Sequence, residues 1–289
     1  MRLIKKLEYF ILAATMIDIL EKMKTEMLRR KYSLRTIGSY CDAVKAFLKR
    51  STIEDARRIK KSDIKEYLNT LHEKSGNTIN VHLNALKFMM EEILHKNCYV
   101  HIRYSKAPQR VPDYLTKEEV IKLLDAIENP KHKLMIKLMY SAGFRLSELV
   151  NLKVQNLNFE ENTGWIRGGK GNKDRAFIIA QSLKSELQDY ISDNKLNPEN
   201  FVFEGRDGRV SHRTIQEILK SAGKRANITK HIHPHMLRHS FATHLVKDGT
   251  DLFTVQSLLG HSDVRTTQIY AHVANPKLIS VKSPLDSLK

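Results

Sequence analysis

The sequence has little cysteine and no long apolar run. Only two of its 289 residues are cysteines, Cys41 and Cys98, and their spacing forms no paired motif. This argues against a secreted disulfide scaffold and indicates a cytoplasmic chain whose thiols pack in its interior. The apolar stretch from Tyr9 to Ile17 lies between Glu8 and Asp18 and is far shorter than the ~20 residues that span a bilayer. We therefore expect neither a membrane helix nor a targeting segment.

Acidic side chains are scarce beside basic ones. The chain has 49 Lys and Arg against 32 Asp and Glu, a net charge of +17. The excess occurs in both halves, with 23 basic and 13 acidic residues in 1–113 and 26 and 19 in 114–289. The length suits two domains, and two separately basic domains favour a polyanion gripped by both, such as a DNA duplex. Solvated lysines on a basic globular protein would give the same count.

Three amphipathic segments in the first half predict a small helical bundle. Ser33 suits the N-cap of a helix whose apolar residues recur at three- and four-residue spacing as far as Leu48. A second helix is predicted over 62–76, where Gly76 would end it, and a third over 79–93. We therefore expect a helical domain over 1–102. Residues 1–30 are expected either to add a further N-terminal helix or to include an over-extended start, for which Met16 and Met23 are the alternatives.

The segment 103–113 predicts a linker between the domains. Two prolines and several polar residues in RYSKAPQRVP resist regular structure. Its basic side chains, Arg103, Lys106 and Arg110, suit contacts with phosphates, which carry no information about base sequence.

The second half, 114–289, predicts a mostly helical α+β domain. Thr116 and Glu119 form a capping box at its first helix, and another helix is predicted from about 131 to Gly143. The β-prone stretches on either side of GGKGNKD predict a hairpin with a basic tip, and helices are expected again from 214. The predicted fold class is therefore mainly α, a helical bundle followed by a helical domain with a small hairpin.

Five short motifs of the second half carry reactive side chains, and each is weak by itself. Gly143 and Gly260 suit helix ends, and Pro234 suits a helix start. A lone arginine, lysine or tyrosine at such places is usually a surface or packing residue. The reactive residues are Arg145 in GFRLSEL, Lys170 in GGKGNKD, His235 and Arg238 in HPHMLRH, His261 in LGHS, and Tyr270 in TTQIYAH.

The histidines between His231 and His244 raise the alternative of a metal site. The zincin pattern needs a glutamate directly after the first histidine of an i, i+4 pair, and after His235 the sequence has Met236 instead. No carboxylate or thiolate accompanies the histidines. We therefore expect no metal.

Taken together, the motifs resemble a known signature. Segments 233–245, HPHMLRHSFATHL, and 258–272, LLGHSDVRTTQIYAH, are similar to the C-terminal motifs of the tyrosine recombinase (lambda-integrase) family. LGHSDVRTTQIYAHV is most similar to the Xer branch, the chromosome-dimer-resolving recombinases of bacteria and archaea. The first half resembles the core-binding domain of that family. The residues before Ser33 are more numerous than expected for a Xer chain.

The resemblance implies a set of active-site residues, with Glu148 as a supporting carboxylate. It implies a metal-free and ATP-independent exchange of DNA strands at a dif-like site, without a cofactor. It further implies double-stranded DNA as partner, a homotetramer in synapsis, and a tail, 273–289, that docks into a neighbouring protomer. Packing of this tail on its own domain is the alternative. Lys173 and Arg175 near the hairpin tip are expected to contact phosphates. The implied catalytic residues are Arg145, Lys170, His235, Arg238, His261 and Tyr270.

These residue types suit phosphodiester exchange without a metal. Arg145 and Arg238 can fork onto the non-bridging oxygens, where negative charge accumulates, and His261 can add a donor. Tyr270, whose free pKa is about 10, needs a base, for which His235 is the candidate. Lys170 would protonate the departing 5′-oxygen.

Three other functions share parts of this pattern. A type IB topoisomerase would use the same chemistry without pairing two sites. A DNA-binding protein that has lost catalysis would lack part of the reactive set, which is intact in this sequence. A metal-dependent nuclease would lose its activity in EDTA.

Overall fold

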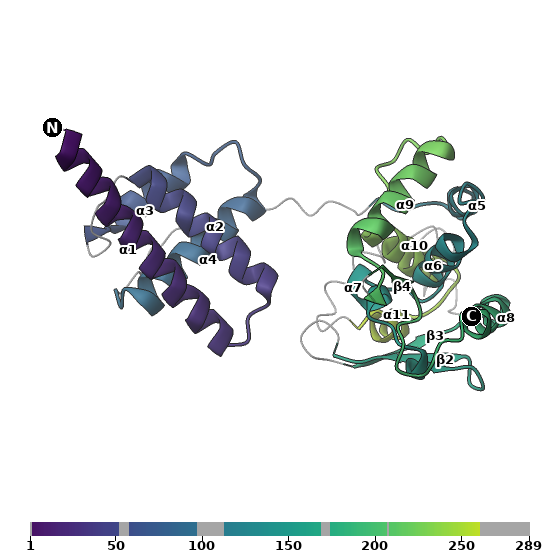
Figure 1. Cartoon of the computed structure of the whole chain (residues 1–289). Coiled ribbons are helices and arrows are strands. Elements are labelled where there is room, and N and C mark those ends of the chain that lie inside the picture. The colour runs from purple at the N-terminus through teal and green to yellow at the C-terminus, as the bar shows by residue number, and fades with distance from the viewer. Residues whose placement is uncertain (1, 52–57, 97–112, 169–173, 207, 261–289) are drawn as a thin grey trace, which may run out of the picture. The chain divides into compact units, whose positions relative to one another are not determined.

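The computed structural model divides into two compact units, Met1–Gln109 and Arg110–Lys289, and each is described by itself (Figure 1). The division falls within 103–113, the predicted linker, most of which lies outside the described residues. For 2–15 only the course of the helix is described. The described residues are 2–51, 58–96, 113–168, 174–206 and 208–260.

The N-terminal unit is helical, as predicted. Ser33 caps α2, because its Oγ accepts the backbone N–H of Thr36 at 3.1 Å. The prediction that the next helix ends at Gly76 was wrong, because that helix already ends at Asn69 and Gly76 begins α4. Ser75 caps α4 by accepting the N–H of Thr78. The described helices are α1 (Arg2–Arg29), α2 (Leu34–Ser51), α3 (Lys61–Asn69), α4 (Gly76–Phe88) and the π-helical η2 (Met89–Ile93).

The long helix α1 belongs to the core of this unit. Met23 and Met27 are fully buried in the same cluster as Phe47 of α2 and Leu86 of α4. The expected extra N-terminal helix therefore contributes directly to the apolar core. Cys41 is also buried there. Among the described helices, none combines the length and the apolar character that crossing a bilayer requires.

The C-terminal unit is helical with two small sheets, and the mainly α fold class is confirmed. The predicted capping box at α5 is present, with the Thr116 side chain accepting the N–H of Glu119 and the Glu119 carboxylate accepting the N–H of Thr116. Its elements are α5 (Lys117–Asp125), α6 (Pro130–Ser141), α7 (Leu146–Val150), η3 (Val154–Asn156), β1 (Leu157–Asn158), β2 (Thr163–Ile166), β3 (Arg175–Ile178), α8 (Gln181–Asp193), β4 (Glu204–Gly205), β5 (Gly208–Arg209), α9 (His212–Arg225), α10 (Pro234–Lys247) and α11 (Leu252–Leu259).

The predicted hairpin is formed by β2 and β3. The two strands pair antiparallel from Thr163 opposite Ile178 to Ile166 opposite Arg175, and β1 adds a third strand beside β2. Helix α8 follows β3 directly, earlier than the expected return of helices at 214. The apolar signal of α8 is weak, because only Leu183 and Leu187 are buried.

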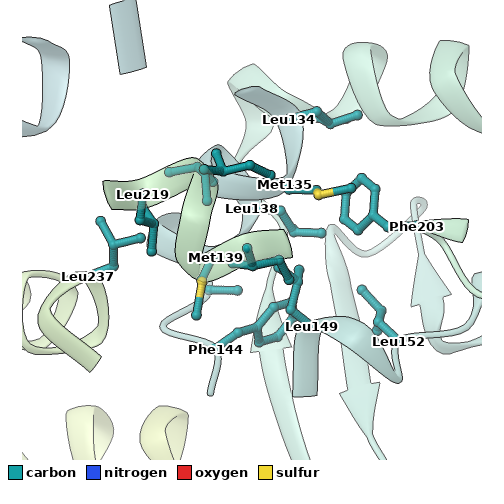
Figure 2. Packing of buried hydrophobic residues seen from close by; sticks show 14 of the residues in the cluster. Leu134, Met135, Leu138, Met139, Phe144, Leu149, Leu152, Phe203, Leu219 and Leu237 are labelled. Atoms are coloured by element: carbon teal, nitrogen blue, oxygen red, sulfur yellow. The ribbon is translucent and has the colours of Figure 1, made fainter. Parts of the chain in front are cut away.

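Helix α6 lies in the centre of the C-terminal core. Figure 2 shows Leu134, Leu138 and Met139 of α6 among leucines and phenylalanines from the surrounding elements. Phe144 lies in the turn after α6, and its ring meets that of Phe177 of β3 edge-on at 4.7 Å between centroids. This packing holds the hairpin against the turn that leads into α7, which carries the first candidate residues.

Candidate active site

Arg145 lies at the start of α7, directly after a tightly packed turn. Gly143 has a φ of +58°, which favours glycine, and a Cβ at this position would overlap the ring of Phe241. Arg145 is the N-cap of α7, and its side chain is 17% exposed. The turn therefore fixes the backbone of an arginine whose guanidinium still reaches the surface.

Glu148, one turn later, is the carboxylate that the neighbouring arginines share. Its side chain is only 3% exposed. One oxygen, Oε1, accepts Nη1 of Arg145 at 2.6 Å, while Oε2 accepts the backbone N–H of Arg145 at 2.9 Å and Nη2 of Arg175 at 2.7 Å. Nη1 of Arg238 lies 3.8 Å from Oε2.

The acidity of Glu148 follows from these neighbours. Burial by itself would raise the pKa of this carboxyl, but the hydrogen bond and charge of Arg175, the backbone N–H of Arg145 and the charge of Arg238 outweigh it. The pKa therefore lies below its ordinary value, and Glu148 is ionised at neutral pH.

Arg238 reaches the same place from α10, where Pro234 occupies the predicted first helical turn. Its side chain is 3% exposed. Nη1 donates to the carbonyl of Gly143 at 2.6 Å, and Nη2 donates to the carbonyl of Leu259. Arg238 thus joins the turn before α7 to the end of α11.

The end of α11 receives three arginines on successive carbonyls. Arg175 donates to Leu258, Arg238 donates to Leu259, and Arg145 lies 3.4 Å from the oxygen of Gly260. Gly260 has φ +60° and ψ +45°, the predicted left-handed helix end. The last carbonyls of a helix lack intrahelical donors and carry its negative pole, so guanidinium groups suit them.

The histidines of α10 differ in their surroundings. His233 caps the helix by accepting the N–H of Met236. His235 is exposed, and its ring lies 6.4 Å from that of His239 between centroids. Among the described side chains, no three of His, Cys, Asp or Glu form a group that could hold a metal ion.

We expect the stability of the C-terminal unit to fall as the pH drops from about 6.5 to 4. Burial, then the charges of His235, His233 and Arg238, lower the pKa of His239 to about 4. A histidine in the unfolded chain titrates near 6.5, so over this interval only the unfolded chain gains the proton. The stabilising contribution is therefore present above about pH 6.5 and lost as the pH falls through about 4.

Urea unfolding at several pH values would measure this effect. Replacement by a side chain that does not titrate, His239→Gln, should reduce the fall in the free energy of unfolding between pH 7 and 4.5. Equal falls in the variant and the wild type would show that His239 has no part in it.

The structure brings together only part of the predicted set. Arg145, Glu148 and Arg238 converge, and His235 lies one turn before Arg238 on α10. Seven other predicted residues lie outside the described residues: Arg103, Lys106, Arg110, Lys170, Lys173, His261 and Tyr270.

Arg175 differs from its expected role. It was predicted to contact phosphates from the hairpin tip, but its side chain is 5% exposed and pairs with Glu148. Residues of a strand alternate between its two faces, and Arg175 shares the buried face of β3 with Phe177. The period of two in RAFI was the available signal of an inward side chain, and the basic surroundings of the hairpin tip obscured it.

Models of known protein families match both halves of the chain. Residues 113–276 match the Phage integrase family, and 19–99 match the Phage integrase N-terminal SAM-like domain. Tyrosine recombinase XerA of Pyrococcus horikoshii is 36% identical over 268 residues, covering 90% of this chain and 91% of the relative. Tyrosine recombinase XerD of Oceanobacillus iheyensis is 35% identical, covering 84% and 87%. The crystal structure of XerH site-specific recombinase bound to palindromic difH substrate, a post-cleavage complex, superposes with a TM-score of 0.71 at 25% identity, covering 89% and 82%.

Proposed function

Because this chain belongs to the phage integrase family and is a tyrosine-type site-specific recombinase of the Xer branch, we propose that it exchanges DNA strands through a covalent 3′-phosphotyrosyl link to Tyr270. The observation that carries the proposal is the convergence of Arg145 and Arg238. They come from separate segments and meet on Glu148 and on the end of α11. The chain leaves α11 directly into the motif that contains His261 and Tyr270.

The two arginines stabilise the transition state. Attack on a phosphodiester adds negative charge to the non-bridging oxygens, and guanidinium donors fixed in place beforehand contribute about 3–4 kcal/mol each in comparable sites. Glu148 carries one negative charge among three guanidinium groups, those of Arg145, Arg175 and Arg238, so the cluster keeps an excess of positive charge. His261 donates a further hydrogen bond to the same oxygens.

The bonds exchange as follows. The phenolic oxygen of Tyr270 attacks the scissile phosphorus, and its proton passes to His235. The bond between phosphorus and the 5′-oxygen breaks, and Lys170 gives a proton to that oxygen. The products are a 3′-phosphotyrosine and a free 5′-hydroxyl. Another 5′-hydroxyl can reverse the reaction and reseal the strand, so neither ATP nor a metal is required.

The partner of the chain in this proposal is a DNA duplex. Both halves of the sequence are basic, with net charges of +10 in 1–113 and +7 in 114–289. The similarity to XerH bound to its difH substrate supports a dif-like target. Resolution of chromosome dimers is the role proposed for the chain at such a site. Recombination of two such sites needs four protomers, and 273–289 would dock into a neighbouring protomer to couple their active sites.

Trapping on nicked DNA tests the proposal. Duplexes that carry candidate dif-like sites should accumulate a covalent protein–DNA adduct in EDTA when a nick just 3′ of the scissile phosphate lets the short fragment with the free 5′-hydroxyl diffuse away. Tyr270→Phe should bind the same DNA and form no adduct. An adduct that persists in this variant, or one that requires a divalent metal, would contradict the mechanism. Relaxation of plasmids without exchange between two sites would indicate a topoisomerase instead.

A further inference from the structure

We propose that Arg175 is a positioning residue of the recombinase, which aims the catalytic Arg145 by way of Glu148 and fixes the end of α11 that leads to His261 and Tyr270. The inference rests on the proposed function, because it gives Arg175 a task within that active site.

The first observation is that Arg175 is buried with specific partners. Its Nη2 donates to Oε2 of Glu148 at 2.7 Å, its Nη1 donates to the carbonyl of Leu258, and its guanidinium carbon lies 5.6 Å from the centre of the Phe144 ring. Its Nε–H meets no acceptor among the described residues. A buried ion pair adds little net stability beside an apolar pair, and an unsatisfied buried donor lowers stability. Stability alone therefore does not account for an arginine at this position.

The second observation is that Arg175 and Arg145 share one carboxylate. Oε2 of Glu148 is held by Arg175 and by the backbone N–H of Arg145, which leaves Oε1 directed at Nη1 of Arg145 at 2.6 Å. Without Arg175 only the backbone N–H of Arg145 would hold Oε2, and the carboxylate could turn more freely about its last torsion, which has no sharp minimum. The guanidinium of Arg145, which is partly exposed, would then lose the contact that sets its direction.

Arg175 also contacts the end of α11. Arg175 donates to the carbonyl of Leu258, and a Cβ on Gly260 would lie 2.7 Å from its Cδ, so the chain crosses the side chain of Arg175 in close contact. Arg175 therefore holds both the turn before α7, through Glu148, and the turn after α11.

Arg175 is also part of the hairpin formed by β2 and β3. Arg175 pairs with Ile166 in the last described register position before the tip that contains Lys170. Since Arg175 is anchored to Glu148 and to α11, it also fixes the point at which the hairpin leaves the sheet. One side chain thus links three segments that supply the proposed catalytic groups.

The test compares DNA binding with cleavage in Arg175→Lys and Arg175→Gln of the full chain. We expect adduct formation on the nicked duplex to slow at least tenfold for lysine, which keeps the charge but cannot reach both acceptors, and about a hundredfold for glutamine. The Kd for the same duplex should stay within threefold. Arg225→Gln is the matched control, because Arg225 also donates to a carbonyl at a helix end, that of Ala126, and we expect it to cleave normally.

A double-mutant cycle distinguishes positioning from a merely structural role. Because Arg175 acts in part by aiming Arg145, the loss of rate caused by Arg175→Lys should be clearly smaller in the Arg145→Lys background than in the wild type. Three results would overturn the inference. They are losses of rate that multiply in full in the double variant, a Kd that rises in step with the loss of rate, and wild-type cleavage in both Arg175 variants. Should Arg175→Gln fail to fold, Arg175→Lys carries the test. A wild-type protein that forms no adduct would instead refute the proposed function itself, and the inference with it.

Discussion

Alanine at Arg145 or at Arg238 is expected to slow formation of the covalent adduct by about 10²–10³-fold, but only Arg238→Ala should also destabilise the protein. In the proposed mechanism each variant loses a donor to the transition state, so we expect similar losses of rate. The side chain of Arg145 is 17% exposed, whereas that of Arg238 is 3% exposed and bonds the carbonyls of Gly143 and Leu259. Loss of these buried hydrogen bonds should lower the free energy of unfolding by about 3–5 kcal/mol.

Single-turnover cleavage and urea unfolding of both variants would measure the two effects separately. Arg238→Lys serves where Arg238→Ala is too unstable to assay, and Arg225→Ala, on α9, controls for the loss of a surface arginine. Equal losses of stability in Arg145→Ala and Arg238→Ala would contradict the difference in burial. Cleavage at the wild-type rate in either variant would remove that arginine from the site.

Alanine at Glu148 is expected to lower the free energy of unfolding as much as alanine at Arg238, by about 3–5 kcal/mol. Removal of one partner of a buried ion pair leaves the other charge without compensation. Here the carboxylate serves three arginines, two of which, Arg175 and Arg238, have side chains no more than 5% exposed. We therefore expect Glu148→Ala to lower both the urea midpoint and the rate of adduct formation.

Two variants serve as controls for this prediction. Glu148→Gln keeps the shape and one acceptor, so its loss of stability should be smaller than that of Glu148→Ala. Glu186→Gln removes the carboxylate from a pair with Lys137 at 2.6 Å in which both side chains are about a third exposed, and should change stability by less than about 1 kcal/mol. Similar losses in Glu148→Ala and Glu186→Gln would show that burial does not determine the effect.

The helices and their ends could be predicted from local chemistry. The cap at Ser33, the capping box at Thr116 and the left-handed end at Gly260 each depend on contacts within a few residues, which the sequence displays directly. The prediction for 62–76 was wrong because Gly76 was taken as a helix end. Glycine is also accepted next to a cap, and Ser75 makes it a helix start.

The sequence named candidate residues for the site but not the contacts between them. The resemblance to the family names Arg145, His235 and Arg238, whose catalytic roles stay predictions. The role of Arg175 depends on packing of β3 against α11 and α7, which joins residues 27 and 83 positions apart in the sequence. No local sequence pattern predicts which carboxylate a basic residue will contact when the two are this far apart in the sequence. Only the alternation of buried residues along β3 indicated that Arg175 points inward.

The three carbonyls at the end of α11 also determine when the site can assemble. Their partners Arg145, Arg175 and Arg238 precede them by 115, 83 and 21 residues. During synthesis the arginines therefore emerge first, and none can reach its acceptor until 258–260 have left the ribosome. A nascent chain that stops before 258 contains the three arginines without the turn on which they meet. In the proposed mechanism, such an incomplete product of translation should be unable to cleave DNA.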